Sequence, residues 1–341
     1  MSSSPTAVVM MNLGGPASLD DVEPYLFNLF SDRDLIQLPL GFLWQKQLAR
    51  RISRTRAPDS REIYAAIGGR SPILEHTTAQ ARAVEELLGP GYRTYVGMRS
   101  WEPYIGEAVD RLVADGAEEV VALPLYPQRS RTTSGSAMRE LRRMLKKKAP
   151  SLPVHEVCCF PDTPGLVGSW LEKILPIYDG ISAERRGSAH VLFSAHGLPQ
   201  KVIDRGDPYL AQVQASVRAV MDGLPAGLSH SLSFQSRATR AKWLEPATED
   251  ELERLASLGV KDVIVVPIAF VTEHVETLYE LDMLLKEPAV AAGIDGYHRV
   301  DAPGTAPKLM EELAELVRRA RESGDEPLCS APGGVRCPRI R

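Results

Sequence analysis

An internal repeat sets the strongest limit on how this 341-residue chain can fold. The segment LVADGAEEVVALPLYP at 112–127 matches LASLGVKDVIVVPIAF at 255–270. In the same way, VVMMNLGGP at 8–16 lines up with VLFSAHGLP at 191–199. Self-similarity of this kind predicts two halves with the same local structure.

Each half alternates short apolar runs with longer amphipathic segments. Runs such as 7–13, 92–98 and 154–160 have the length and composition of buried strands, and segments of 10–15 residues between them have helical spacing. This alternation predicts an α/β fold with two parallel sheets facing a central cleft. No Ser/Gly-rich linker is present, so we place the boundary at the polar stretch SAERRGS. The expected divisions are 7–182, 188–322 and a Cys-containing tail at 323–341.

Composition excludes several classes of protein. The chain is 44% hydrophobic and 25% charged, as in ordinary soluble proteins, and its net charge of −4 argues against a nucleic-acid partner. The N-terminus lacks a basic stretch followed by an apolar core, and no apolar run reaches the roughly 18 residues of a spanning helix. No GxGxxG or Walker-type loop is found, so a nucleotide cofactor has no support. We expect a cytoplasmic protein.

Ionisable side chains directly follow two of the predicted strands. His196 ends one apolar run and precedes Gly197, where backbone or ligand can approach closely. Glu276 and Glu280 follow the run VIVVPIAF, and if Thr272 caps a helix they share one helix face. Because ligands of open α/β sheets bind outside the carboxyl ends of the strands, we expect these groups to form one site.

Glu273 and His274 lie in the same segment and add to this site. An imidazole with one to three carboxylates suits Fe²⁺ or another first-row divalent ion. It differs from the closed four-ligand set of a structural zinc site, and a sparse set can release its metal. The same groups also suit proton transfer. The alternative is a solvated acidic helix face, in which the acids only complement the helix dipole.

The first half offers groups for an anionic ligand. Residues 34–56 combine an apolar stretch with a basic cluster, which is typical of a membrane-surface patch, of an apolar cleft lip, or of a helix with one buried side. The candidate anion-binding residues are Arg54, Arg56, Tyr64, Ser71 and Arg99. Together they indicate a cleft for a large apolar ligand with carboxylates, although surface arginines commonly only face solvent.

Five segments resemble the ferrochelatases, the enzymes that insert Fe²⁺ into a porphyrin to make haem. They are MMNLGGPASLDDVEPYLFNLFSDRDLIQLP, YAAIGGRSPI, LFSAHGLP, RGDPY and PIAFVTEHVETLYELD, spread over residues 8–285. The resemblance implies two Rossmann-like domains of the chelatase type, in agreement with the repeat. It also implies a lyase of haem biosynthesis whose substrates are Fe²⁺ and a porphyrin, with no cofactor required for the chemistry.

The resemblance further implies roles for individual residues. The metal site would be His196 and Glu276, with His274 and Glu280 as catalytic companions that take or relay protons. The porphyrin would contact Leu13, Arg56, Tyr64, Ser71, Arg99 and Trp243. One departure is SRATR at 236–240, which lacks the glycine and proline usual before this tryptophan. The family pattern around Arg237 and Trp243 is therefore incomplete in this chain.

The mechanism implied is a clamped, bent porphyrin whose nitrogen lone pairs tilt toward the metal, with peripheral binding offsetting the strain. His196, expected to be neutral at pH 7, would either accept a pyrrole proton or hold Fe²⁺. Glu276 and its neighbours would collect the two protons that leave the porphyrin.

Four cysteines extend the resemblance. Some family members hold a [2Fe–2S] cluster on one internal and three C-terminal cysteines. This chain has two of each kind, Cys158, Cys159, Cys329 and Cys337. Four thiolates satisfy such a cluster, so these are its candidate ligands. The alternative is four unligated cysteines, two in a strand and two in a loose tail.

The identity of the porphyrin depends on Leu13. Family members acting on coproporphyrin tend to carry a tyrosine there, so Leu13 and the apolar residues 35–44 favour protoporphyrin IX, with coproporphyrin III as the alternative. The same apolar stretch allows loose membrane attachment. Two rivals are a cobalt chelatase of corrin precursors and a non-catalytic porphyrin or haem carrier. A carrier needs no proton-accepting carboxylates, so the acidic cluster favours an enzyme. The sequence indicates no oligomeric state.

Overall fold

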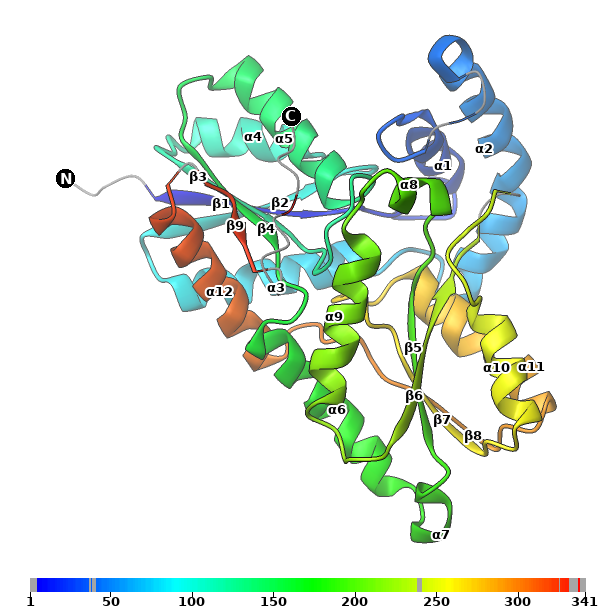
Figure 1. The fold of residues 1–341 in the computed structure, drawn as a ribbon. Helices are drawn as coiled ribbons and strands as arrows, with labels where there is room; N and C mark the ends of the chain where they lie inside the picture. Colours follow the sequence, from blue (N-terminus) through cyan, green and yellow to red (C-terminus); the bar gives the residue numbers. More distant parts are fainter. Residues whose placement is uncertain are drawn as a thin grey trace. The chain divides into compact units, whose positions relative to one another are not determined.

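The computed structural model describes residues 5–36, 38, 41–237, 241–324, 326–330 and 337, and at 41 and 42 the backbone only. It contains two fully parallel sheets (Figure 1). The first has the order β2-β1-β3-β4-β9, formed by β1 (Thr6–Asn12), β2 (Tyr92–Met98), β3 (Val120–Pro124), β4 (Val154–Cys159) and β9 (Leu328–Cys329). The second has the order β6-β5-β7-β8, formed by β5 (His190–His196), β6 (Ser229–Gln235), β7 (Asp262–Val266) and β8 (Gly296–Arg299).

Helices cover both faces of each sheet (Figure 1). Around the first sheet, α4 (Ile105–Ala114) and α5 (Ser134–Lys148) lie on one face, and α3 (Ile73–Leu88) and α12 (Pro307–Glu322) on the other. Around the second, α6 (Pro164–Gly180) and α9 (Tyr209–Met221) lie opposite α10 (Thr248–Ser257) and α11 (Lys286–Ala291). Every residue of β1, β3 and β7 is therefore buried, which explains why their sequences are continuous apolar runs.

The repeat in the sequence is a repeat in the fold. The first four strands of each half are arranged in the same order, with β1 and β5 in equivalent inner positions. The matched segments 112–127 and 255–270 supply β3 and β7, and the helices α4 and α10 precede them. The predicted α/β fold with two similar parallel sheets is thus confirmed. The cleft between the halves stays a prediction.

The compact units do not follow a single break at 182–188. One unit comprises residues 1–160 with 310–330 and 336–341, and the other comprises 161–309 with 331–335. Helix α6 belongs to the second unit because it packs on α9, and most of α12 returns to the first. In α12, Arg318 donates to the carbonyl of Leu87 at 2.7 Å. Strand β9 extends the first sheet, so these tail residues are not loose.

The apolar stretch expected to form a lip is described in part, because residues 37, 39 and 40 lie outside the described residues. Helix α1 (Val22–Ser31) packs on α2 (Gly41–Ala66), which is kinked at Trp44. The side chains of Leu43 and Trp44 are 64% and 53% exposed. None of the described helices is long and apolar enough to cross a membrane.

Candidate active site

The candidate site lies at the carboxyl edge of the second sheet. His196 is the last residue of β5, Gln235 is the last residue of the neighbouring β6, and Ser236 follows it. A loop after β7 leads into η1 (Glu276–Leu284), a π-helix that carries Glu276 and Glu280. Parallel strands bring these groups together because their carboxyl ends share one edge. The expectation that His196, His274, Glu276 and Glu280 gather in one place is therefore met by the geometry.

A hydrogen bond of 2.8 Å joins His196 Nδ1 to Glu276 Oε2. The neighbouring Glu280 accepts a bond of 2.5 Å from Ser236 Oγ and one of 3.2 Å from Gln235 Nε2. The side chain of His196 keeps 33% of its surface exposed and that of Glu276 keeps 19%, so a small ligand can reach both. The hydroxyl of Tyr209, from the RGDPY segment, donates to the His196 carbonyl at 2.9 Å and fixes the end of β5.

The pair His196 and Glu276 is charged. Burial lowers the pKa of His196, but the adjacent carboxylate outweighs burial and leaves this pKa raised. Burial likewise raises the pKa of Glu276, and the two histidines near it outweigh that effect and lower it to about 2. The resting pair is thus an imidazolium beside a carboxylate. This differs from the neutral imidazole expected from the sequence, which shows no partner for His196.

The pKa shifts of Glu280 and His274 are opposite to those of Glu276 and His196. Burial, followed by the negative charge of Glu276, raises the pKa of Glu280 to about 7. Burial lowers the pKa of His274, whose Nε2 lies 3.9 Å from Glu276 Oε2. Within the described part of the chain, His274 Nδ1 is buried without a hydrogen-bond partner. Near neutral pH the site therefore holds a neutral imidazole and a carboxyl group that exchanges its proton readily.

Two residues of this edge, Gln235 and Ser236, were not singled out from the sequence. Ser236 has a φ of +66°, in the left-handed region that only glycine, asparagine and aspartate enter readily. This conformation lets its hydroxyl reach Glu280 and, at 3.4 Å, Glu276. Gln235 is oriented by Ser194 Oγ at 2.7 Å and donates to the Glu276 carbonyl at 2.8 Å. Their position at the end of a strand beside β5 was the signal available in the sequence.

The predicted helix cap at Thr272 is wrong, since η1 begins at Glu276 and has no side-chain cap. Glu273 consequently lies outside the acidic face. It accepts hydrogen bonds from Arg299 Nη1 and the Ala302 amide, both at 2.7 Å. Arg299 also donates from Nε to Asp282, at 2.7 Å. This arginine, at the end of β8 and with its side chain 9% exposed, thus joins the residues before η1 to its C-terminal half.

Close backbone approach explains Gly197. A Cβ there would lie 2.8 Å from the Gln235 carbonyl oxygen and 3.4 Å from the Trp243 ring. Trp243 is 9% exposed and packs against this turn, so in the second unit it supports the loop that follows His196. Arg237 pairs with Asp250 at 3.0 Å, and the remaining residues of SRATR, 238–240, lie outside the described residues.

In the first unit, Leu13, Ser71 and Arg99 lie near one another at the equivalent carboxyl edge. The amide of Arg99 donates to the Asn12 carbonyl at 2.9 Å, and the amide of Ser71 donates to the Pro16 carbonyl at 2.9 Å. The Arg99 guanidinium pairs with Asp32 and donates to Ser136 Oγ at 2.9 Å, so its charge is partly neutralised.

The other predicted porphyrin contacts lie on α2. The exposed Arg56 stacks on the Phe30 ring, with 5.5 Å between guanidinium carbon and ring centroid. Tyr64 is 5% exposed. Nearby, the exposed Arg54 pairs with Glu23 at 3.6 Å. Within the first unit, Arg56 and Arg54 thus each have a side-chain contact, and Tyr64 is buried.

Comparison with known proteins decides the family. The sequence model described as ferrochelatase matches residues 5–321. The chain is 45% identical over 323 residues to the ferrochelatase of Geotalea daltonii, covering 94% of this chain and 100% of that protein. It is 43% identical over 312 residues to the ferrochelatase of Aquifex aeolicus, covering 91% and 98%.

The chain belongs to the ferrochelatase family. The resemblance read from the five segments is confirmed. Among solved structures, SirB from Bacillus subtilis with Fe³⁺ has a TM-score of 0.56 at 13% identity, over 93% of this chain and 95% of that one. The sirohydrochlorin chelatase SirB in complex with cobalt, from Bacillus subtilis subspecies spizizenii, has a TM-score of 0.57 at 11% identity, over 94% and 96%. These two structures share the chelatase fold.

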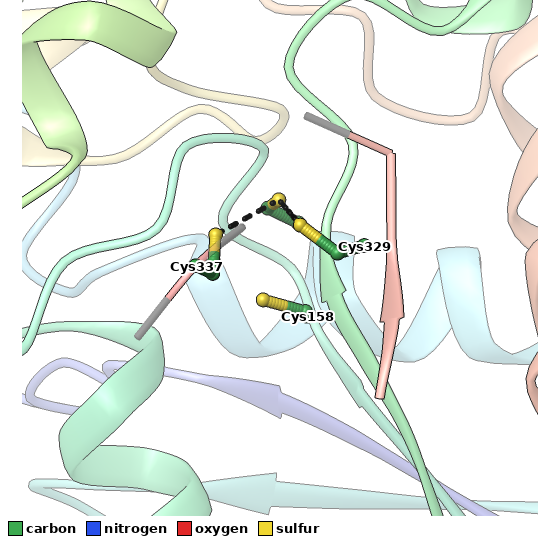
Figure 2. A group of neighbouring side chains, drawn as sticks. Cys158, Cys329 and Cys337 are labelled. Atoms are coloured by element: carbon green, nitrogen blue, oxygen red, sulfur yellow. Dashed lines mark hydrogen bonds between the residues drawn. The ribbon is translucent and has the colours of Figure 1, made fainter. Parts of the chain in front are cut away.

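This ferrochelatase-family chain also brings its four cysteines together, as the sequence predicts (Figure 2). Their sulfur atoms all lie within 4.8 Å of one another, and Cys159 is 3.5 Å from Cys329 and 3.6 Å from Cys337. None of the four forms a disulfide bond in the described part of the chain. The set belongs to the first unit, whereas His196 belongs to the second, and its four donors are sufficient to hold a metal.

The raised pKa of Glu280 gives the first prediction. A carboxyl group should titrate near pH 7 in infrared difference spectra of the protein and vanish in Glu280→Gln, whereas the surface variant Glu287→Gln should keep it. Because the folded pKa of about 7 exceeds the ordinary 4.5, this group stabilises the fold at low pH. Its contribution should be lost as pH rises from about 4.5 to 7, and Glu280→Gln should flatten that slope. A band that persists in Glu280→Gln would assign the titration elsewhere.

A second prediction concerns Arg299. Arg299→Met leaves Glu273 charged and unpaired with Arg299 while its side chain is only 14% exposed, so the free energy of unfolding in urea should fall by about 3–5 kcal/mol. Adding Glu273→Gln should recover part of that loss, because the unpaired charge is removed. Arg237→Met, at the exposed pair with Asp250, should cost less than about 1 kcal/mol. Equal losses in Arg299→Met and Arg237→Met would show that Arg299 does not secure η1.

Proposed function

We propose that the protein is a protoporphyrin ferrochelatase, a lyase that inserts Fe²⁺ into protoporphyrin IX and forms protohaem. The single observation that supports this proposal is that two histidines and two glutamates at one sheet edge have pKa values shifted in opposite directions. His196 and Glu276 form a charged pair, whereas the lowered pKa of His274 keeps its imidazole neutral and the pKa of Glu280 is about 7. Metal insertion needs both a place for a dication and acceptors for two protons, and this set supplies both.

Fe²⁺ would be received by His196 and Glu276. A dication entering beside them competes with the imidazolium proton, so binding the metal and releasing that proton are coupled. Two protein donors leave most of the coordination positions of the ion open, which suits an ion that must be passed to four porphyrin nitrogens. Neither donor is a thiolate, so the ion is not held as in a structural site.

Two protons leave the porphyrin for each Fe²⁺ that enters, and the charges then balance. We assign their acceptance to Glu280, when ionised, and to the neutral imidazole of His274. Ser236 and Gln235 donate to Glu280 and keep it oriented. His274 would be a second acceptor through its Nδ1, which has no hydrogen-bond partner among the described residues, while its Nε2 lies 3.9 Å from Glu276 Oε2. Proton transfer through positioned groups of this kind contributes about 10²–10⁴-fold to a rate.

The porphyrin would contact Leu13, Arg56, Tyr64, Ser71, Arg99 and Trp243, as the resemblance implies. The apolar Leu13 at the end of β1 favours the less carboxylated protoporphyrin IX over coproporphyrin III. The exposed Leu43 and Trp44 would allow loose membrane contact of a cytoplasmic enzyme, next to a poorly soluble substrate. A porphyrin carrier is disfavoured, because it has no use for a carboxyl group tuned to neutral pH.

The third prediction tests the metal pair. His196→Ala and Glu276→Gln should lower anaerobic haem formation by at least about 10²-fold, while fluorescence titration still detects porphyrin binding. The surface variant His230→Ala is the matched control and should retain full turnover. Near-normal turnover in His196→Ala or Glu276→Gln would rule out the roles assigned to them.

The fourth prediction concerns substrate choice. Wild-type protein should form haem in multiple turnovers from protoporphyrin IX and more slowly from coproporphyrin III. Leu13→Tyr should shift the ratio of kcat/KM values toward coproporphyrin, because a hydroxyl is placed where the additional carboxylates lie. Leu13→Met keeps the position apolar and should leave the ratio unchanged. A wild-type preference for coproporphyrin would overturn the assignment of substrate but not of reaction.

A further inference from the structure

The spacing of the four cysteines does not fit the [2Fe–2S] cluster that the family resemblance implies. In such a cluster, cysteines on opposite irons are separated by two metal ions and two sulfides, so one set of sulfur–sulfur distances must be long. A single tetrahedral ion with metal–sulfur bonds of about 2.3 Å places all its sulfurs about 3.8 Å apart. Here every pair of sulfurs lies within 4.8 Å, and Cys159 Sγ is 3.5 Å from Cys329 Sγ and 3.6 Å from Cys337 Sγ. No long pair exists in this set.

We infer that these cysteines bind one tetrahedral divalent ion, Zn²⁺ or Fe²⁺, as a structural Cys₄ site. The ion would join β4 to the tail, across 170 residues of sequence between Cys159 and Cys329. Strand β9 has only two residues, so its pairing with β4 is a weak attachment by itself. A thiolate-bound ion would fasten it.

A register shift in β4 allows two consecutive cysteines, Cys158 and Cys159, to face the same ion. Neighbouring residues of a regular strand point to opposite faces, so Cys158 and Cys159 could not both serve one ion. However, Val157 pairs with Leu328 and Cys159 with Cys329, which leaves Cys158 as an extra residue on β4. A bulge of this kind turns a side chain toward a new direction. Figure 2 shows the sulfurs of Cys158, Cys329 and Cys337 turned toward a common space.

The surroundings suit a negatively charged thiolate site. Four thiolates with one dication carry a net charge of −2, which is costly to bury without a partner. Arg129 is 7% exposed and its Nη1 donates to Cys158 Sγ at 2.6 Å. This contact both offsets the charge and orients one ligand, as is usual around bound metals. Cys158 and Cys159 are 6% and 1% exposed, so the site is shielded from water.

The test begins with metal and acid-labile sulfide in the full chain purified without oxygen. We expect one zinc or iron per chain and no sulfide. His196→Ala should give the same stoichiometry, which shows that the counted ion is not bound at the proposed active site. The Cys₄ site and the proposed function can therefore be refuted independently. Two irons with two sulfides per chain would establish the binuclear cluster instead. Cysteines that resist alkylation until they are reduced would indicate disulfides and would equally overturn the site.

Co²⁺ then serves as a spectroscopic probe of the metal-free chain. The thiolate charge-transfer band and the strong ligand-field bands of tetrahedral Co²⁺ should saturate at one equivalent. Cys337→Ser and Cys159→Ser should lose these bands, whereas the neighbouring control Ser330→Ala should keep them. Chelation should also accelerate amide exchange at Leu328 and Cys329. Bands that persist in both cysteine variants, or exchange at β9 that ignores the metal, would contradict the inference.

Discussion

The charged contact between His196 and Glu276 is the interaction on which the rest of the site depends. It places an imidazolium and a carboxylate 2.8 Å apart where β5 ends and η1 begins. Burial, followed by the negative charge of Glu276, keeps the carboxyl group of Glu280 protonated up to about pH 7. Glu276 and Glu280, on adjacent turns of η1, therefore have very different proton affinities, with pKa values of about 2 and about 7. An uncharged residue at 196 would raise the pKa of Glu276, because the charge and hydrogen bond of His196 hold that pKa down.

The two halves separate scaffold from chemistry. Both use the same strand order, and β1 and β5 occupy equivalent positions. Leu13 follows the end of β1, at the place where His196 ends β5. Burial on both faces requires apolar strands in each half, so strand interiors cannot differ much. The carboxyl edges are free to differ, and at the matched position one half has the ionisable His196 while the other has the apolar Leu13.

Much of this arrangement could be predicted from the sequence, because apolar runs mark buried strands and parallel strands share an edge. The residues that were missed act through geometry that a one-dimensional pattern does not carry. Ser236 depends on a left-handed backbone conformation, and Arg299 depends on the pairing of β8 with β7. The helix η1 is a π-helix that begins at Glu276, so Glu273 lies before it and pairs with Arg299 instead. The compact units escaped prediction because α12 returns to the first sheet late in the chain.

The two proposed metal sites differ in their donor atoms and in whether their coordination would be complete. At the edge of the second sheet, two of the donors are oxygen and nitrogen atoms that also bind each other, so an incoming ion must compete with a proton. In the first unit, four sulfurs face one another beside a buried arginine, and softer donors in a full tetrahedron retain a metal. A transferable Fe²⁺ and a retained ion can therefore coexist in one chain. The affinity of each place follows from its donor atoms and from whether its coordination is complete.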